Sequence, residues 1–359
     1  MEITQPDPVD IPDYERLAPS HLSTIAWEYI NGGAADELTL RWNRESFQKI
    51  RLRPNVLVDV SKVDPRVNLF GQELPFPILL APAAYQRLLQ PQGELAAVRG
   101  AGAAGATFII STTSTTSIED IAAVATKPLW FQLYIQPERD LTRELVQRAE
   151  AAGCKALVVT VDTPVLGPRY RETRSHFTLP PGVERANFSG RKHAGGAQRA
   201  IPGTIYTAFQ DPTVTWKDLA WIRSLTSLPV LLKGILDPDD AARAVEAGVQ
   251  GIVVSNHGAR NLDTVPAAID ALPGVVERVA GRMPVLVDGG IQRGTDVLKA
   301  IALGASAVLI GRPYLYGLAV AGEKGVTHVI NILRRELEMA MASTGRPTVA
   351  AINGSVLWR

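Results

Sequence analysis

The stretch GIVVSNHGARNLD, residues 251–263, carries an imidazole and a guanidinium at the end of an apolar run. His257 can exchange a proton near neutral pH, because the ordinary pKa of histidine lies in that range. Arg260 can bind a carboxylate or a phosphate through two parallel hydrogen bonds. Residues 252–254 are typical of a buried strand, and Gly258 allows the chain to turn tightly after it. The pattern favours an acid–base site beside an anion-binding group; a polar loop without chemistry is the alternative.

Polar residues also follow five other apolar runs of the sequence. Because the carboxyl ends of the strands meet on one face of a parallel barrel, we expect these residues to share one site. Taken singly, each has a structural explanation, such as an aspartate that caps a turn or a lysine that extends from a strand end. Their occurrence at six strand ends favours a catalytic site. The residues are Gln132, Tyr134, Thr160, Asp162, Lys233, Ser255, His257, Asp288, Gly311 and Arg312, with Arg169 a little further along.

From about residue 75 the chain alternates short apolar runs with longer stretches rich in Ala, Leu, Glu and Arg. Continuous apolar runs are typical of strands that are buried on both faces of a parallel sheet. Eight strand–helix units predict an α/β fold of the (β/α)8 TIM-barrel type, and a doubly wound sheet is the alternative. The predicted strands are 76–81, 107–111, 129–134, 156–161, 229–233, 251–255, 284–288 and 306–310. The predicted helices are 91–104, 117–125, 139–152, 215–226, 237–247, 264–281 and 293–303, with a last helical stretch and a further C-terminal helix within 313–343.

Two segments fall outside this alternation. Residues 1–75 form an N-terminal extension, with a helix predicted near 20–31 and a short hairpin near 66–75. Residues 164–213 follow the fourth strand and are rich in Gly, Pro, Arg and Ser. A long loop at the C-terminal face of a barrel predicts a mobile lid over the active site. Because no region of different composition is present, we expect a single domain over residues 1–359.

Gly100, Gly102 and Gly105 spell the GxGxxG pattern of dinucleotide-binding sites. They lie at the end of a predicted helix and before a strand. A phosphate-binding motif needs the opposite order, in which a strand leads into the N-terminus of a helix. We therefore expect these glycines to allow close packing of a helix on the sheet.

The junctions after the seventh and eighth strands are better candidates for phosphate binding. Gly289 and Gly290 follow one strand, and Gly311 follows the other. Barrels often bind a phosphate between these two loops, where backbone N–H groups and a helix N-terminus attract an anion. Arg293 or Arg312 could add charge-assisted hydrogen bonds. The sequence therefore predicts a phosphorylated cofactor or substrate.

The overall composition excludes several function classes. The chain carries 37 Lys and Arg against 36 Asp and Glu, a net charge of +1, which gives no electrostatic basis for binding nucleic acid or an anionic membrane. No apolar run reaches the roughly 18 residues of a membrane span. Cys154 is the only cysteine, the first residues do not resemble a signal peptide, and the histidines are scattered. We therefore expect a cytoplasmic protein without an internal disulfide or a metal site.

Over nearly its whole length the chain resembles the FMN-dependent (S)-2-hydroxy acid oxidases and dehydrogenases, a family that includes glycolate, lactate and hydroxymandelate oxidases. The resemblance rests on the motifs WEYINGGAADELTL, APAAYQRL, FQLYI, TVDTPVLGPRYRE, LLKGIL, SNHGARNLD, VDGGIQRGTD and LIGRP. It implies a barrel that holds FMN at its C-terminal mouth. It also implies oxidation of an (S)-2-hydroxy acid to the 2-oxo acid, with oxygen reduced to hydrogen peroxide, and a homotetramer.

The resemblance implies roles for individual residues. His257 is the catalytic base, and Asp162 orients it and stabilises its charged form. Arg169 and Arg260 bind the carboxylate of the substrate, and Lys233 faces the flavin edge on which negative charge grows. Contacts to the carboxylate or the hydroxyl are implied for Tyr29 and Tyr134. Flavin contacts are implied for Pro82, Ala83, Ala84, Ser111, Gln132, Thr160 and Ser255, and contacts to the ribityl chain or the phosphate for Asp288, Gly289, Gly290, Gln292, Arg293, Gly311 and Arg312.

Several residues depart from the family pattern. Gln292 replaces the first Arg of the common GGIRRG, so FMN binds more weakly if that guanidinium matters. Asn261 replaces a Gln, which we expect to change support rather than chemistry. Ala83 and Thr113 are smaller than the usual residues, so we expect a substrate larger than glycolate, of the mandelate type or a medium-chain acid. Ala84 stands where mandelate dehydrogenases carry Gly, which favours oxygen as the electron acceptor.

Other functions remain open from the sequence. Within flavin chemistry these are a dehydrogenase with a different acceptor, a monooxygenase, and a lactate or glycolate oxidase. Outside it, a phosphosugar lyase or isomerase barrel without flavin would use the same phosphate-binding loops.

Overall fold

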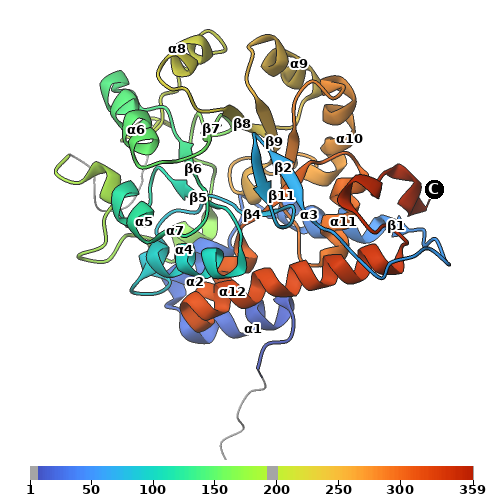
Figure 1. Cartoon of the computed structure of the whole chain (residues 1–359). Helices are drawn as coiled ribbons and strands as arrows, with labels where there is room; N and C mark the ends of the chain where they lie inside the picture. Colours follow the sequence, from blue (N-terminus) through green and yellow to red (C-terminus); the bar gives the residue numbers. More distant parts are fainter. Residues whose placement is uncertain (1–6, 192–200, 359) are drawn as a thin grey trace, which may run out of the picture.

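The computed structural model describes residues 7–191 and 201–358. At its centre a closed barrel of eight parallel strands runs in the order β4 to β11, with helices around the outside (Figure 1). The predicted (β/α)8 architecture is confirmed, and each predicted strand overlaps one barrel strand. The strands are β4 (Ile78–Leu80), β5 (Phe108–Ser111), β6 (Leu129–Leu133), β7 (Leu157–Thr160), β8 (Val230–Ile235), β9 (Gly251–Val254), β10 (Val285–Asp288) and β11 (Ala307–Ile310).

The helices after the strands pack their apolar faces on the barrel, and each matches a predicted helical stretch. The last of them bends where Ala321 and Gly322 leave helical geometry, which accounts for the prediction of two successive helices. The helices are α4 (Gly93–Ala104), α5 (Ile118–Val124), α6 (Arg139–Ala151), α8 (Asp218–Ser224), α9 (Pro238–Glu246), α10 (Ala268–Val279), α11 (Gly294–Ala302) and α12 (Arg312–Ser343).

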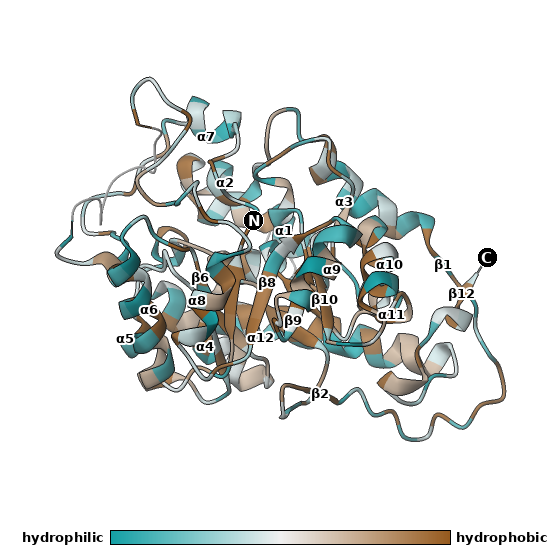
Figure 2. Cartoon of the chain, turned by 90° about the horizontal axis from the view of Figure 1, so that it is seen from above, coloured by the Kyte–Doolittle hydropathy of each residue, from teal (hydrophilic) through white to brown (hydrophobic). Residues whose placement is uncertain are grey.

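A predicted hairpin closes the N-terminal end of the barrel. It consists of β2 (Val67–Leu69) and β3 (Gln72–Leu74), and Figure 2 places β2 at the opposite end of the molecule from α2, α3 and α7. Leu69 and Leu74 join the apolar cluster inside the barrel. Gln72 Oε1 accepts a hydrogen bond from Nε1 of the fully buried Trp130 at 3.3 Å. The other end of the barrel, at the carboxyl ends of the strands, therefore remains for the functional site.

The N-terminal extension is more helical than predicted. The single helix expected near 20–31 is two helices, α1 (Ile11–His21) and α2 (Thr24–Asn31), and a third, α3 (Leu38–Lys49), was not predicted. The break occurs because Ser23 begins a new helix: its hydroxyl accepts a hydrogen bond from the N–H of Ala26 at 3.2 Å. Short strands β1 (Arg51–Leu52) and β12 (Leu357–Trp358) pair near the end of the chain.

Asp263 ties this extension to the barrel. Its carboxylate accepts hydrogen bonds from the backbone N–H groups of Asp36, Leu38 and Thr39, at 2.8–3.2 Å. Leu38 and Thr39 belong to the first turn of α3, where N–H groups lack partners within the helix, and Asp36 lies just before it. Although burial opposes ionisation, the backbone donors hold the pKa of Asp263 below its usual value. The last residue of the NHGARNLD motif thus anchors a helix.

The GxGxxG segment serves packing, and its first glycine packs against a helix rather than the sheet. A Cβ on Gly100 would lie 2.6 Å from the carbonyl oxygen of Glu323 and 2.8 Å from Val326 Cβ, both in α12. Gly105 ends α4 with a φ of 87°, a conformation that favours glycine. Close packing is therefore present as predicted, but the partner of Gly100 is α12 and not the sheet.

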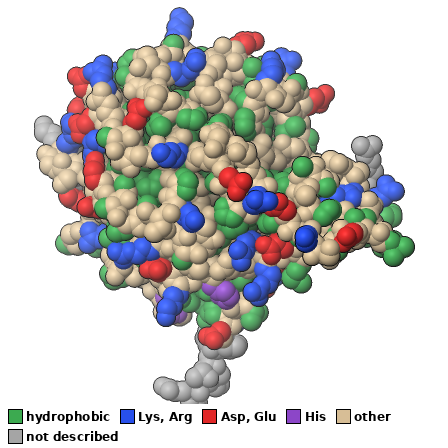
Figure 3. Space-filling view, in the orientation of Figure 1, with side chains coloured by type: hydrophobic (Ala, Val, Ile, Leu, Met, Phe, Trp, Pro, Cys, Tyr) green, Lys and Arg blue, Asp and Glu red, His purple; other side chains and the backbone are tan. Residues whose placement is uncertain are grey.

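The segment predicted as a lid contains the short helix α7 (Tyr170–Arg174) and a 3-10 turn at Ala186–Phe188. Residues 192–200 of that prediction, and residues 1–6 of the extension, lie outside the described residues. No helix in the described ranges is long and apolar enough to cross a membrane. On the face seen in Figure 3, basic and acidic side chains are intermixed, in line with the balanced charge.

Candidate active site

A cavity of about 690 Å³ opens at the carboxyl ends of the barrel strands. Strand ends, α2, α3 and the segment after β7 form its walls. Of the predicted site residues, those that line it are Tyr29, Pro82, Ala83, Ala84, Ser111, Gln132, Tyr134, Thr160, Arg169, Lys233, His257, Arg260, Asp288, Gly289, Gly290, Gln292, Gly311 and Arg312. Asp162 and Ser255 contact residues that line the cavity, whereas the Arg293 side chain lies elsewhere.

His257 and Asp162 form a partly buried pair at the mouth of the barrel. Nδ1 of His257 lies 2.9 Å from Oδ1 of Asp162, and the Tyr134 hydroxyl lies 3.4 Å from Nε2 of the same ring. Burial lowers the pKa of His257; Asp162 opposes this effect, and Lys233 and Arg169 add to it. Burial also opposes ionisation of Asp162, but His257 and Lys233 outweigh it, so its pKa lies below the usual value. At neutral pH the imidazole is therefore neutral and able to accept a proton.

The backbone around His257 is unusual. His257, Gly258 and Ala259 have φ values of 58°, 61° and 62°, all in the left-handed region. For non-glycine residues this conformation costs roughly 1 kcal/mol or more each, and such strain concentrates at functional sites. The predicted tight turn is present, but His257 itself adopts the left-handed geometry. Asn256 Oδ1 supports the turn by accepting the N–H of Ala259 at 3.1 Å.

Asn256 is held in turn by the extension. Asn43, in α3, and Asn256 donate to each other's side-chain oxygens at 3.1 and 2.8 Å. Asn43 also lines the cavity. The docking of α3 thus supports the backbone that presents the base.

Lys233 is buried in β8 and has two polar partners. Its Nζ lies 2.8 Å from Asp288 Oδ2 and donates to Ser255 Oγ at 2.8 Å. Burial alone lowers the pKa of the ammonium, but the carboxylates of Asp288 and Asp162 outweigh it and raise the pKa above the usual value. The site therefore keeps a fixed positive charge below the cavity.

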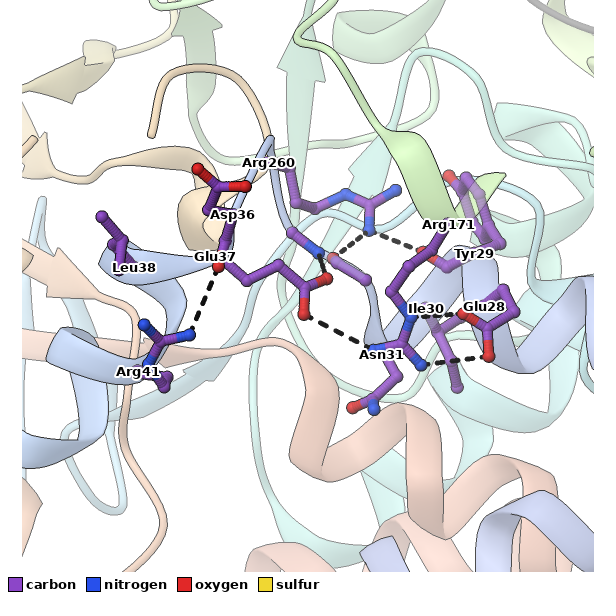
Figure 4. Close-up of polar contacts among 12 residues, drawn as sticks. Glu28, Tyr29, Ile30, Asn31, Asp36, Glu37, Leu38, Arg41, Arg171 and Arg260 are labelled. Carbon is purple, nitrogen blue, oxygen red and sulfur yellow. Dashed lines mark hydrogen bonds and ion pairs between the residues drawn. The ribbon is translucent and has the colours of Figure 1, made fainter. Parts of the chain in front are cut away.

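Two guanidiniums line the side of the cavity near α2. Arg260 lies over the ring of Tyr29, with Cζ 4.8 Å from the centroid, and donates to the carbonyl oxygens of Tyr29 and Gly32 (Figure 4). Arg169 donates to the carbonyl oxygen of Arg260 at 3.1 Å and to Asn261 Oδ1 at 3.2 Å. Asn261 also donates to the backbone carbonyl of Asp162 at 3.0 Å, which fits the supporting role expected for it.

The N-terminus of α11, which follows the seventh barrel strand, differs from the predicted phosphate site. The N-terminus of α11 is already satisfied, because Asp296 accepts the N–H groups of Gln292 and Arg293 at 3.0 Å and Glu336 accepts that of Gly294 at 2.8 Å. The Arg293 side chain turns away to Asp10 and Glu336, at 2.7 and 3.1 Å. It therefore does not contact the cavity, contrary to the prediction.

The N-terminus of α12 is the other predicted phosphate-binding position, and it does line the cavity. Gly311 and Arg312 begin this helix at the cavity wall. The Arg312 guanidinium donates to the carbonyl oxygens of Ile30, Gly258 and Gly32, at 2.8–3.0 Å. Burial lowers its pKa to about 10, so it stays protonated at neutral pH. A helix N-terminus with a buried guanidinium beside it favours a phosphate.

Together, the fold and the cavity bring a histidine paired with a carboxylate, two arginines and the N-terminus of α12 to the carboxyl end of one barrel. The family model for FMN-dependent dehydrogenases matches residues 18–359, and the chain belongs to that family. It is an enzyme whose cofactor is FMN.

Similar proteins are oxidases of 2-hydroxy acids. The chain is 51% identical to an L-lactate oxidase of Nostoc sp., over 98% of each chain. It is 46% identical to a peroxisomal (S)-2-hydroxy-acid oxidase of Oryza sativa subsp. japonica, over 97% of this chain and 95% of the relative. A crystal structure of mandelate oxidase superposes with a TM-score of 0.90 at 43% identity, over 98% of each chain.

The cavity fits FMN. Asp288 Oδ1 and Gln292 Oε1 are buried without a hydrogen-bond partner among the described residues, and both residues line the cavity. Unpaired acceptors of this kind suit the hydroxyl donors of a ribityl chain. A Cβ on Gly290 would lie 1.9 Å from the backbone oxygen of Asn43, so only glycine fits where α3 closes on this loop.

Sequence reasoning missed several residues of the cavity wall. Glu172 and Phe177, in the segment after β7, and Asn43 and Arg44, in α3, line the cavity. The only signal for Glu172 is its position three residues after Arg169, a spacing that brings side chains together on a helix. No sequence pattern indicated that Asn43 and Arg44 line the cavity, because the position of α3 depends on its contact with Asp263, which is distant in sequence.

Proposed function

We propose that the protein oxidises an (S)-2-hydroxy acid to the 2-oxo acid and passes the electrons to oxygen, giving hydrogen peroxide. The observation that carries this proposal is the pair of His257 and Asp162, which faces the same cavity as Arg169 and Arg260. The reaction removes the hydrogen on Cα and the hydrogen of the hydroxyl group from the acid, in total two protons and two electrons. When bound, FMN supplies the two-electron acceptor.

The substrate carboxylate lies against the two arginines, because a planar guanidinium matches a carboxylate. Tyr29 and Tyr134 donate to the carboxylate or the hydroxyl; burial raises the pKa of both phenols, so they remain protonated donors. Nε2 of His257 accepts the proton. Asp162 receives the hydrogen bond from Nδ1 and stabilises the imidazolium that forms.

Residues of the barrel hold the cofactor. Lys233 places its charge at the flavin edge on which negative charge accumulates. The backbone at Gly311 and the guanidinium of Arg312 bind the phosphate. The other flavin contacts come from Pro82, Ala83, Ala84, Ser111, Gln132, Thr160 and Ser255, and those to the ribityl chain or the phosphate from Asp288, Gly289, Gly290 and Gln292.

The substrate has a side chain larger than that of glycolate. Ala83 and Thr113 leave space at the cavity wall. In the same cavity wall, Tyr29 stacks on Phe177 with ring centroids 4.6 Å apart and lies 5.5 Å from the ring of Tyr85. Aromatic walls favour an aryl or medium-chain alkyl group. The 51% identity with an L-lactate oxidase supports lactate as the second candidate.

An anaerobic titration tests the function directly. The flavin absorption of the purified holoenzyme is recorded before and after addition of (S)-mandelate, L-lactate and glycolate. We expect mandelate to bleach the flavin band fastest and peroxide to form in equimolar amount when air is admitted. If lactate alone bleaches the flavin band, the substrate is lactate and the protein is a lactate oxidase. If a quinone but not air reoxidises the reduced flavin, oxygen is not the electron acceptor and the proposed oxidase activity is contradicted.

Light scattering of the same sample tests the expected homotetramer.

A further inference from the structure

A carboxylate of the protein already lies between the two arginines of the proposed substrate site. Arg260 Nη2 donates to Glu172 Oε1 at 2.8 Å, and Arg169 Nη1 lies 3.5 Å from the same oxygen atom. Glu172 belongs to α7 and lines the cavity. Both guanidiniums therefore share one carboxylate in the way that a substrate carboxylate would require.

The three side chains are largely withdrawn from water, with 14% of Arg260, 15% of Arg169 and 15% of Glu172 exposed. Two cations placed together in such surroundings repel each other strongly. Burial first, and then Arg260, lower the pKa of Arg169, and Glu172 opposes both effects. Glu172 thus stabilises the paired guanidiniums before any acid binds.

We propose that Glu172 is a built-in competitor of the substrate carboxylate, which an incoming 2-hydroxy acid displaces from Arg260 and Arg169. This inference rests on the proposed function, since it takes the two arginines as the carboxylate site. A second carboxylate in the same fork is repelled by the first, so binding of the acid includes the loss of the Glu172 contacts. The same exchange in reverse assists departure of the 2-oxo acid, which carries the same carboxylate.

The helix that carries Glu172 is fixed independently of this contact. Arg171, its neighbour in sequence, pairs with Glu28 of α2 and lies 3.7 Å from Glu37 Oε2 (Figure 4). A Cβ on Gly32 would lie 3.5 Å from Arg171 Cβ, so α2 and α7 pack closely. Because these contacts do not involve Glu172, its side chain can rotate away from the arginines while α7 stays in place.

The test is the affinity of the FMN-loaded enzyme for benzoate, an unreactive carboxylate, read from the perturbation of the flavin absorption at low ionic strength. Glu172→Gln removes the competing charge and nearly preserves the shape. We expect it to lower the dissociation constant for benzoate about tenfold, the scale of one charge-assisted hydrogen bond. For benzamide, which lacks the carboxylate, we expect the dissociation constants of Glu172→Gln and of the parent enzyme to agree within about twofold. Product inhibition by the 2-oxo acid should strengthen in parallel.

Glu37→Gln is the matched control. It removes one negative charge close to the same helix without touching Arg169 or Arg260, so benzoate affinity should change by less than about twofold. Glu172→Asp keeps the charge but shortens the side chain, and its benzoate affinity should lie between those of the parent and Glu172→Gln. It also serves as the second variant if Glu172→Gln does not retain FMN.

The outcomes separate this inference from the proposed function. If the parent enzyme does not bind benzoate, the carboxylate site and the proposed function fail together. If the parent binds benzoate but Glu172→Gln binds it equally or more weakly, the proposal that Glu172 competes with the substrate is wrong. Glu172 then serves to orient the arginines. An equal gain in Glu37→Gln also overturns it, because the effect is then one of general charge.

Discussion

Nδ1 of His257 lies 2.9 Å from Oδ1 of Asp162, and this contact sets two opposing effects on the proposed base. Burial lowers the pKa of the imidazole, while the carboxylate raises it. The second carboxylate oxygen, Oδ2, is buried without a partner among the described residues. The charge of Asp162 is therefore directed at the ring through a single oxygen, and the base depends on that one contact for the stability of its protonated form.

Replacing Asp162 by Asn should lower kcat/KM about 100-fold, because the imidazolium formed in the reaction loses its counter-charge. The same change removes the group that raises the pKa of His257, so that pKa falls further. Since the base acts when deprotonated, the acidic limb of the pH profile of kcat/KM should move to lower pH. A limb that stays in place or moves to higher pH would contradict the assignment. Asp120→Asn, at an exposed position on α5, is the control.

Replacing Asp263 by Asn should lower the free energy of unfolding by about 1–3 kcal/mol, because the first turn of α3 loses a charged acceptor for its backbone N–H groups. Urea unfolding of the apoprotein measures it. Asp64→Asn, which breaks an exposed pair with Arg66, should cost less than about 1 kcal/mol. Equal losses in the two variants would show that α3 docks without Asp263.

Replacing Gln292 by Arg restores the guanidinium that the family pattern carries at the phosphate end. We expect the dissociation constant for FMN to fall about tenfold, while that for riboflavin, which lacks the phosphate, stays within about twofold. Fluorescence quenching of the free flavin on binding to apoprotein gives both constants. Gln147→Arg, on the exposed side of α6, is the control. A parallel gain for riboflavin would mean that the introduced guanidinium does not act on the phosphate.

Replacing Ala83 by Met fills the space above the proposed flavin position. We expect kcat/KM for (S)-mandelate to fall about 10- to 100-fold and that for L-lactate to change by less than about threefold, since a clash of one side chain costs roughly 1–3 kcal/mol. Steady-state peroxide formation measures both. Ala103→Met, exposed on α4, should leave both values unchanged. An equal loss for both acids would place Ala83 away from the variable part of the substrate.

The barrel could be predicted from the sequence because each strand is a short continuous apolar run and each is followed by a helix. Once the strands are in order, closure of the barrel brings their polar ends together, so the sequence alone was enough to assign His257, Asp162 and Lys233 to one site. These features depend on local sequence and on the fact that all strands of a closed parallel barrel end on the same face.

The remaining features depend on contacts between distant segments. Gln292 and Arg293 are neighbours, yet only the first lines the cavity, because Asp10 and Glu336 hold the second. The break between α1 and α2 depends on one serine cap. The carboxylate of Glu172 reaches Arg260 across 88 residues of chain. No local pattern predicts which of several candidate partners such a side chain meets.

The anchoring of α3 by Asp263 links the docking of the N-terminal extension to the geometry of the proposed base. The backbone turn at His257 relies on Asn256, which relies on Asn43, which reaches the barrel only when α3 is docked. A nascent barrel without its extension would therefore hold a misplaced base and an incomplete cofactor loop. The geometry of the proposed base is therefore complete only when an early segment of the chain, α3, and a late one, the turn after β9, are in contact.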